Sequence, residues 1–174
     1  KEIYDRLYKI TTKNLAGTSN WANIWHPGRW YITSTDFICL ISPAMFDEFV
    51  LPELEMELEW LEASIFHLDG PGALKHLDRL LELPKLKGIQ WVYGAGQPSA
   101  SHWIPILKKI QEKGRLIQVE VKAGELGVML EALKPEGVFY MISNDSPGSG
   151  GAFTEEEAKD IMKMVEASYV KKLY

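Results

Sequence analysis

The stretch FHLDGPGA, residues 66–73, joins the end of an apolar run to a Gly-Pro-Gly turn and the start of an amphipathic helix. Its ionisable side chains are His67 and Asp69. Parallel α/β folds place their polar chemistry at the carboxyl ends of buried strands. The stretch therefore predicts a strand that ends in a site, followed by a helix from Pro71 to Leu83, which Pro84 stops.

Strands and helices alternate along the rest of the chain, and helical periodicity opens it at residues 2–15. The predicted strands are Tyr31–Leu40, Ser64–Leu68, Gly88–Tyr93, Leu116–Val121 and Gly137–Ile142. Ser42 is expected to cap a long acidic helix that reaches Glu62, and Thr154 with Glu157 is expected to form a capping box. Five strands alternating with helices predict right-handed crossovers and a parallel sheet.

Composition limits the class of protein. The 174 residues are 46% hydrophobic, which is typical of one globular domain, expected here over residues 1–174. A net charge of -5 argues against a nucleic-acid partner. The sequence shows no secretory leader and no membrane span, and its single cysteine, Cys39, predicts a buried reduced thiol. A cytoplasmic protein is the expectation.

Two architectures fit this alternation. A doubly wound sheet needs a glycine-rich phosphate turn, and GAGQP at residues 94–98 is a poor one because Pro98 interrupts the expected helix start. The alternative is part of a (β/α)8 barrel, which has about 250 residues when whole. A chain of this length would lack about three βα units of such a barrel.

Two motifs carry a resemblance to a known family. SPAMFDEFVLP, residues 42–52, resembles the SPxxFxxFVLP signature of the uroporphyrinogen decarboxylase superfamily, which includes corrinoid-dependent methyltransferases. HLDG, residues 67–70, is similar to the His-x-(Asp or Cys)-Gly strand end of that superfamily. The motifs, their order and their spacing agree over about residues 30 to 170. The resemblance implies a TIM (β/α)8 barrel, of which this chain would be the C-terminal five or so βα units, with the early strands absent.

The resemblance also raises the question of zinc. The zinc-containing methyltransferases of the superfamily hold the metal with a His-x-Cys pair and a distant cysteine. Here Asp69 stands in place of the first cysteine, and residues 143–148 contain no second one. Because zinc accepts carboxylate oxygen, the implied site would consist of His67, Asp69 and either Glu120 or Asp145.

Three functions remain open. The first is methyl transfer to or from a corrinoid carried by a partner protein, or from a small methylated substrate, with His67 and Asp69 holding a metal or positioning a proton. The second is decarboxylation of a porphyrinogen-like or other carboxylated substrate, with His67 as acid and Asp36 or Asp69 stabilising a protonated intermediate. Only Arg29 and Arg115 lie outside the predicted helices, which is few cations for a polycarboxylate. The third is a non-catalytic partial barrel whose edge strands pair with another chain, as in a homodimer.

Other residues at strand ends are candidates for binding substrate. The set comprises Trp91, Tyr93, Gln97 and Asn144. An aromatic pair beside a glycine turn suits a flat ligand, although aromatic residues on strands also simply pack. Asp36 is expected to face the barrel mouth. Each ionisable candidate has a structural alternative: His67 as a core histidine, Asp69 as a helix cap, and Glu120 as one of a polar trio with Gln118 and Lys122.

Overall fold

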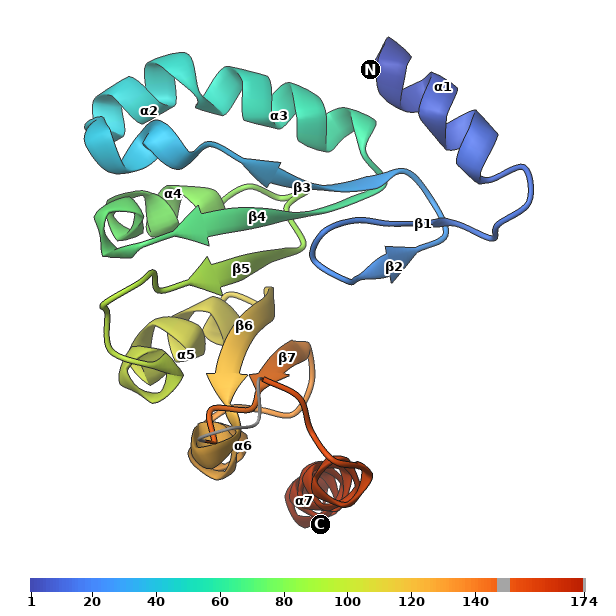
Figure 1. The fold of residues 1–174 in the computed structure, drawn as a ribbon. Coiled ribbons are helices and arrows are strands. Elements are labelled where there is room, and N and C mark those ends of the chain that lie inside the picture. The colour runs from blue at the N-terminus through green and yellow to red at the C-terminus, as the bar shows by residue number, and fades with distance from the viewer. Residues whose placement is uncertain (147–150, 174) are drawn as a thin grey trace. The chain divides into compact units, whose positions relative to one another are not determined.

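The computed structural model describes residues 1–146 and 151–173 and has the expected α/β organisation (Figure 1). A five-stranded sheet has the order β3-β4-β5-β6-β7, and β1 pairs with β2 in a separate two-stranded sheet. The pairs β3–β4 and β6–β7 are parallel. The prediction of five strands in a parallel sheet, with the first and last at its edges, is therefore confirmed.

The elements follow one another in regular alternation. The strands are β1 (Thr18–Ser19), β2 (Trp25–His26), β3 (Trp30–Ser34), β4 (Ala63–Asp69), β5 (Gly88–Val92), β6 (Leu116–Lys122) and β7 (Val138–Ser143). The α-helices are α1 (Glu2–Thr11), α2 (Pro43–Phe49), α3 (Leu51–Trp60), α4 (Leu77–Leu81), α5 (Ile104–Glu112), α6 (Leu126–Ala132) and α7 (Glu155–Leu173). Short 3-10 helices are η1 (Asp36–Leu40), η2 (Pro71–His76), η3 (Ala100–Trp103) and η4 (Ala123–Glu125).

The first strand of the sheet is shorter than predicted. It ends at Ser34, and the apolar residues up to Leu40 form η1 instead. The Ser34 hydroxyl donates a hydrogen bond to Asp36 Oδ1 (3.0 Å), a local contact of the kind that competes with strand pairing. Asp36 therefore begins a helical turn rather than lying in a strand. Cys39, on the same turn, is a free and partly exposed thiol, so the prediction that it is buried was wrong.

Two predicted helices are each divided. The acidic helix after Ser42 consists of α2 and α3, which meet at Val50, because Pro52 in the first turn of α3 favours a new helix start there. The helix from Pro71 begins as η2 and continues as α4, which ends at Leu81. Hydrophobic spacing of helical period continues across such an interruption. The period alone therefore does not show where one helix ends and the next begins.

Both predicted N-terminal caps are confirmed. The Met45 amide donates to Ser42 Oγ (3.2 Å), with Pro43 at the start of α2. At the start of α7 the Thr154 amide donates to Glu157 Oε2 (2.8 Å), and the Glu157 amide donates to Thr154 Oγ1 (3.3 Å). These reciprocal bonds satisfy amides that have no partner within the helix.

The chain divides into two compact units. The first contains residues 1–68 and 72–88. In it, Tyr31 and Thr33 of β3 lie toward α3, where they line a pocket with Trp60. Because side chains alternate along a strand, Trp30 and Ile32 lie on the opposite face, with Ile65 of β4 in register. There they form a buried apolar cluster with Ala22 from the hairpin of β1 and β2.

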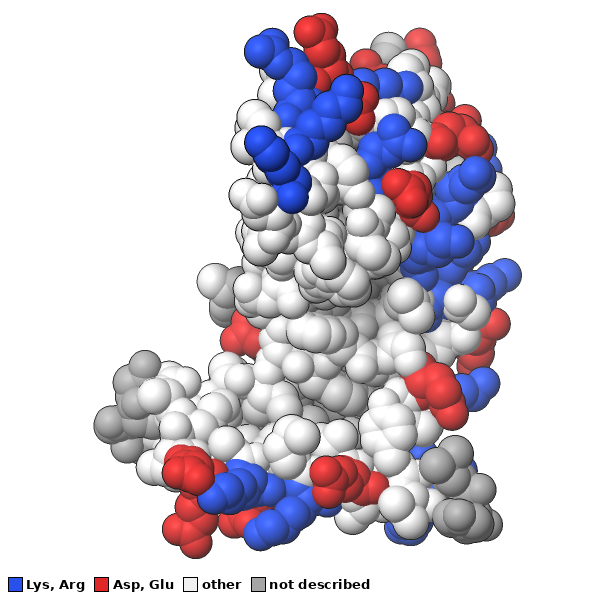
Figure 2. Space-filling view, turned by 90° about the vertical axis from the view of Figure 1, so that its right-hand side faces the viewer, with Lys and Arg blue, Asp and Glu red and all other residues white. Residues whose placement is uncertain are grey.

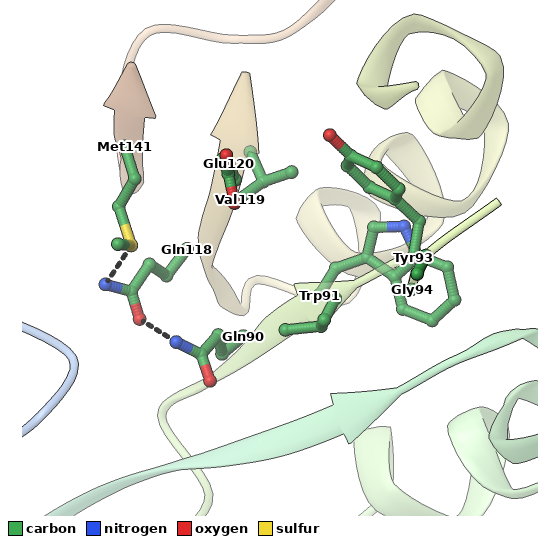
Figure 3. Close-up of a pocket in the computed structure, with 10 residues that line it drawn as sticks. Gln90, Trp91, Tyr93, Gly94, Gln118, Val119, Glu120 and Met141 are labelled. Atoms are coloured by element: carbon green, nitrogen blue, oxygen red, sulfur yellow. Dashed lines mark hydrogen bonds between the residues drawn. The ribbon is translucent and has the colours of Figure 1, made fainter. Parts of the chain in front are cut away.

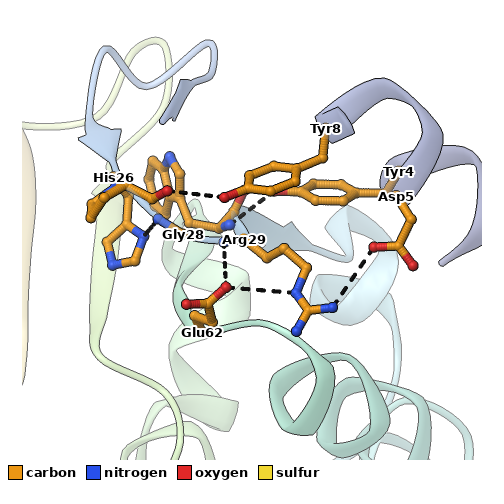
Figure 4. A network of polar contacts seen from close by, with 9 residues as sticks. Tyr4, Asp5, Tyr8, His26, Gly28, Arg29 and Glu62 are labelled. Carbon is orange, nitrogen blue, oxygen red and sulfur yellow. Dashed lines mark hydrogen bonds and ion pairs between the residues drawn. The ribbon is translucent and has the colours of Figure 1, made fainter. Parts of the chain in front are cut away.

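A polar network joins α1 to the start of β3 (Figure 4). The Arg29 guanidinium lies 3.8 Å from Asp5 Oδ1 and 3.6 Å from Glu62 Oε1, and the Arg29 amide donates to the same Glu62 oxygen (2.9 Å). Gly28 leaves room for Glu62, because a Cβ at this position would lie 2.6 Å from the Glu62 carboxyl carbon and the carboxylate would have to shift. The glycine thus allows the carboxylate to approach the backbone closely.

The second unit contains residues 69–71 and 89–174. On β6, Ile117, Val119 and Val121 are buried, and the intervening Gln118, Glu120 and Lys122 share the other face. The parallel register aligns Gln118 with Phe139 and Glu120 with Met141, so β7 contributes to the same face. This polar face of β6 carries the candidate site described below.

The surface is of mixed charge. On the face drawn in Figure 2, basic and acidic side chains are interspersed, as suits a net charge of -5 made of 19 cations and 24 anions. Among residues 1–146 and 151–173, no helix combines the length and the apolar character needed to cross a membrane.

Candidate functional site

His67 lies near the carboxyl end of β4, in the first unit. Its side chain is only 16% exposed, and its Nε2 lies 4.0 Å from Asp36 Oδ1. The Trp21 ring meets the imidazole edge to face, with 5.1 Å between ring centroids. The imidazole therefore lies between the Trp21 ring and the Asp36 carboxylate.

Asp36 reaches this position from η1, directly after β3. Its side chain is 71% exposed, and it accepts the hydrogen bond from Ser34 described above. The structure thus brings two of the predicted catalytic residues, His67 and Asp36, to one place. Trp21 was not predicted as their neighbour, because nothing in the sequence spacing relates residue 21 to residue 67.

Asp69 is the exposed last residue of β4, followed by Gly70, whose φ of +75° makes the turn. The resemblance implied zinc bound by His67, Asp69 and Glu120 or Asp145. Within the described part of the chain, no three His, Cys, Asp or Glu side chains are grouped so as to hold a metal ion. Asp145 Oδ2 instead lies 3.8 Å from the Lys122 ammonium. The zinc site stays a prediction from the resemblance alone.

The second unit has a cavity of about 370 Å³ at the carboxyl ends of β5 and β6 (Figure 3). Its wall comes from the end of β5 and the following turn, from β6 and from one residue of β7. The lining residues are Gln90, Trp91, Val92, Tyr93, Gly94, Ala95, Gln118, Val119, Glu120 and Met141. Ligand sites in α/β folds occur at this end of the strands.

A row of polar contacts forms the floor of the cavity. Gln90 Nε2 donates to Gln118 Oε1 (2.9 Å), and Gln118 Nε2 donates to the Met141 sulfur (3.2 Å). Figure 3 shows the three side chains in line across β5, β6 and β7. Both glutamines are buried, at 5% and 1% exposure. Thioether sulfur is a weak acceptor, so this amide can take a stronger one from a ligand.

Tyr93 and Glu120 give the cavity its electrostatic character. Burial, and then the charges of Glu120 and Glu125, raise the pKa of Tyr93. Its hydroxyl therefore stays protonated at neutral pH and can donate a hydrogen bond. Glu120 is exposed at the end of β6, and the cavity wall contains no Lys or Arg among the residues that the structure describes.

Glu125 forms hydrogen bonds with Ser99 and Ser101, which follow the turn after β5. Its Oε1 accepts hydrogen bonds from Ser99 Oγ (2.7 Å), from the Ser101 amide (3.2 Å) and from Ser101 Oγ. Burial alone would raise the pKa of Glu125, but these hydrogen bonds together lower it. The charged carboxylate thus fixes the start of η3 beside the β5 turn.

The four predicted substrate-binding residues are placed differently. Trp91 and Tyr93 line the cavity, but the Trp91 ring is buried against Trp103 (5.1 Å between centroids). Gln97 is exposed and does not line it. Asn144 is buried and closes its own loop, because its Nδ2 donates to the Ala152 carbonyl (2.6 Å) and its Oδ1 accepts from the Ser146 amide (3.0 Å).

Sequence reasoning missed Gln90 and Met141 as cavity residues. A glutamine inside the apolar strand GIQWV was a usable signal, because a buried amide requires a partner. Met141 gave no such signal, since methionine in a strand is ordinary core. Gln118 and Glu120 were recognised as one polar face, which the structure confirms.

Comparison with known proteins finds no match to this chain among family models, curated proteins or solved structures.

Proposed function

We propose that this chain carries the substrate site of a methyltransferase-type enzyme of the uroporphyrinogen decarboxylase superfamily, and that its five βα units belong to a (β/α)8 barrel. The support for the family is the pair of motifs at residues 42–52 and 67–70. The support for the architecture is the parallel sheet with a polar site at the strands' carboxyl ends.

The composition of the cavity wall favours methyl transfer over decarboxylation. A carboxylated substrate requires cationic donors, usually arginine. Among the described residues that line the cavity, none is Lys or Arg, and Glu120 would repel a carboxylate. A volume of about 370 Å³ suits a small, flat and uncharged methylated molecule.

The cavity residues have separate roles in this proposal. The Tyr93 hydroxyl donates a hydrogen bond to a substrate oxygen, and Gln118 Nε2 exchanges the Met141 sulfur for a better acceptor. The indole Nε1 of Trp91 is buried and makes no hydrogen bond within the described part of the chain, so this ring serves as packing beside the cavity. These groups bind and orient the substrate without contributing positive charge.

In the first unit, His67 is assigned to proton transfer. Its Nε2 lies 4.0 Å from Asp36 Oδ1, so this pair can supply a proton to a group bound beside it. A corrinoid on a partner protein supplies, when bound, a cobalt centre that takes up or gives up the methyl group. Trp21 limits the movement of the imidazole.

Methyl transfer from 4-methoxyphenol to cob(I)alamin, which takes up one proton and forms hydroquinone and methylcobalamin, tests the proposal and is followed by visible absorbance. We expect the protein to accelerate the reaction, and His67→Asn to reduce the acceleration at least about tenfold. The matched control is Glu48→Gln, an exposed position on α2. Release of carbon dioxide from a porphyrinogen carboxylate, without methyl transfer, would contradict the proposal and favour the decarboxylase.

A further inference from the structure

The first unit contains a second pocket, on the face of β3 that lies toward α3. It has a volume of about 500 Å³ and is formed by α1, β3 and α3. The residues that line it are Lys1, Tyr4, Tyr31, Thr33, Glu53, Met56, Glu57, Trp60 and Leu61. Three of them are aromatic and two are carboxylates, whereas the motifs behind the proposed function lie elsewhere.

Three aromatic residues, Tyr4, Tyr31 and Trp60, line this pocket and lie close to one another. The Tyr4 ring centroid lies 4.8 Å from that of Trp60 and 6.5 Å from that of Tyr31, each pair edge to face. The Tyr4 hydroxyl donates to the Trp30 carbonyl (2.8 Å) and accepts from the Trp30 amide (2.9 Å). The central ring is therefore held in place by the backbone of β3 before any ligand arrives.

The charges of the pocket favour a cation. Glu53 and Glu57 are one helical turn apart on α3, where like charges repel. Burial, and then the Glu53 charge, raise the pKa of Glu57. The Trp60 ring already accepts one cation, since the Arg29 guanidinium lies 5.6 Å from its centroid.

We propose that the pocket of Tyr4, Tyr31, Trp60, Glu53 and Glu57 binds an organic ammonium ion. The ring faces attract a cation through their quadrupoles, and their apolar area favours alkyl groups on the nitrogen. The two carboxylates supply the opposite charge. A quaternary ammonium fits best, because it needs no hydrogen-bond acceptor and loses little hydration. The inference is independent of the proposed methyl transfer.

Calorimetric titration with choline and with 3,3-dimethyl-1-butanol tests this site. The two molecules have the same shape and differ by the positive charge. We expect choline to bind at least about tenfold more tightly than the alcohol. Glu57→Gln should weaken choline binding several-fold and leave the alcohol unaffected. Tyr31→Leu, at a ring that is 47% exposed, should weaken choline without unfolding the protein.

Two further variants complete the test. Lys1→Gln should tighten choline binding, because it removes a cation of the chain that lines the pocket. Glu55→Gln, on α3 but outside the pocket, should change nothing. Equal affinity for choline and the alcohol would overturn the proposal. So would a loss of choline binding that is as large in Glu55→Gln as in Glu57→Gln, since the effect would then reflect net charge alone.

Discussion

One sheet face in the first unit is apolar and covered, whereas a sheet face in the second unit is polar and lines a cavity. In the first, the face of β3 and β4 that lies away from α3 carries Trp30, Ile32 and Ile65, and a hairpin covers it. In the second, the polar face of β6 carries Gln118 and Glu120, beside Gln90 of β5, and leaves a cavity. The comparison shows that period-two alternation decides which side chains share a face, and their chemistry decides whether that face becomes core or site.

The largest effect is expected from truncating a core residue on the sheet face that the hairpin covers. Trp30 is 3% exposed, so Trp30→Ala should reduce the free energy of unfolding by about 3–5 kcal/mol. Trp25→Ala is the matched control, because Trp25 lies in the same hairpin region and is 59% exposed. Urea denaturation measures both. Equal losses would mean that the hairpin does not cover an apolar core.

The second test converts the polar face into an apolar one. Gln118→Leu removes the hydrogen bond that the buried Gln90 amide donates to Gln118 and should cost about 1–3 kcal/mol. The double variant Gln90→Leu/Gln118→Leu should recover most of that loss, because both buried amides are removed. A double-mutant cycle of denaturation midpoints gives the coupling. Strict additivity would show that the two glutamines do not depend on each other.

The third test concerns the segment after the cavity turn. Glu125→Gln should cost about 1–2 kcal/mol at neutral pH, because it weakens hydrogen bonds to a charged acceptor. The pKa of the folded state is lowered below the ordinary value of 4.5. The stabilisation is therefore present above pH 4.5 and is lost as the pH falls through the folded-state pKa. Unfolding curves of the wild type and the variant should converge in acid.

The smallest effect is expected at Tyr140, on the other side of β7. Burial, and then the neighbouring Tyr169, raise the pKa of Tyr140 from 10.0 to about 12. The native state should thus lose stability as the pH rises from 10 toward 12, where the unfolded tyrosine ionises first. Tyr140→Phe should remove this slope and change little at pH 7. An unchanged alkaline slope would place the titrating group elsewhere.

Much of the fold could be predicted because its elements depend on local patterns. The strand at β6 alternates polar and apolar residues, and Ser42 and Thr154 cap helices through side chains a few residues away. The residues at which strands and helices end were harder to predict. The apolar run FICL at residues 37–40 has strand composition, but a turn at Asp36 makes it helical. The hairpin of β1 and β2 has only two residues in each strand and was not predicted.

The candidate site was predicted in part for the same reason. His67, Asp69, Tyr93 and Glu120 follow or end strands, which chain position alone reveals. Contacts between residues far apart in the sequence could not be predicted from chain position. The Trp21 ring on His67 and the Gln90–Gln118 bond depend on packing across 46 and 28 residues, and no spacing rule relates such positions.

We propose that the cavity of the second unit binds a small uncharged methylated molecule. The most direct test of this proposal is an NMR titration that follows the Trp91 indole and the side-chain amides of Gln90 and Gln118. We expect 4-methoxyphenol to shift these signals to saturation, and 4-methoxybenzoate, with the same methyl ether and a carboxylate, to bind at least about tenfold more weakly. Tighter binding of 4-methoxybenzoate, or shifts confined to residues outside the cavity, would contradict the claim.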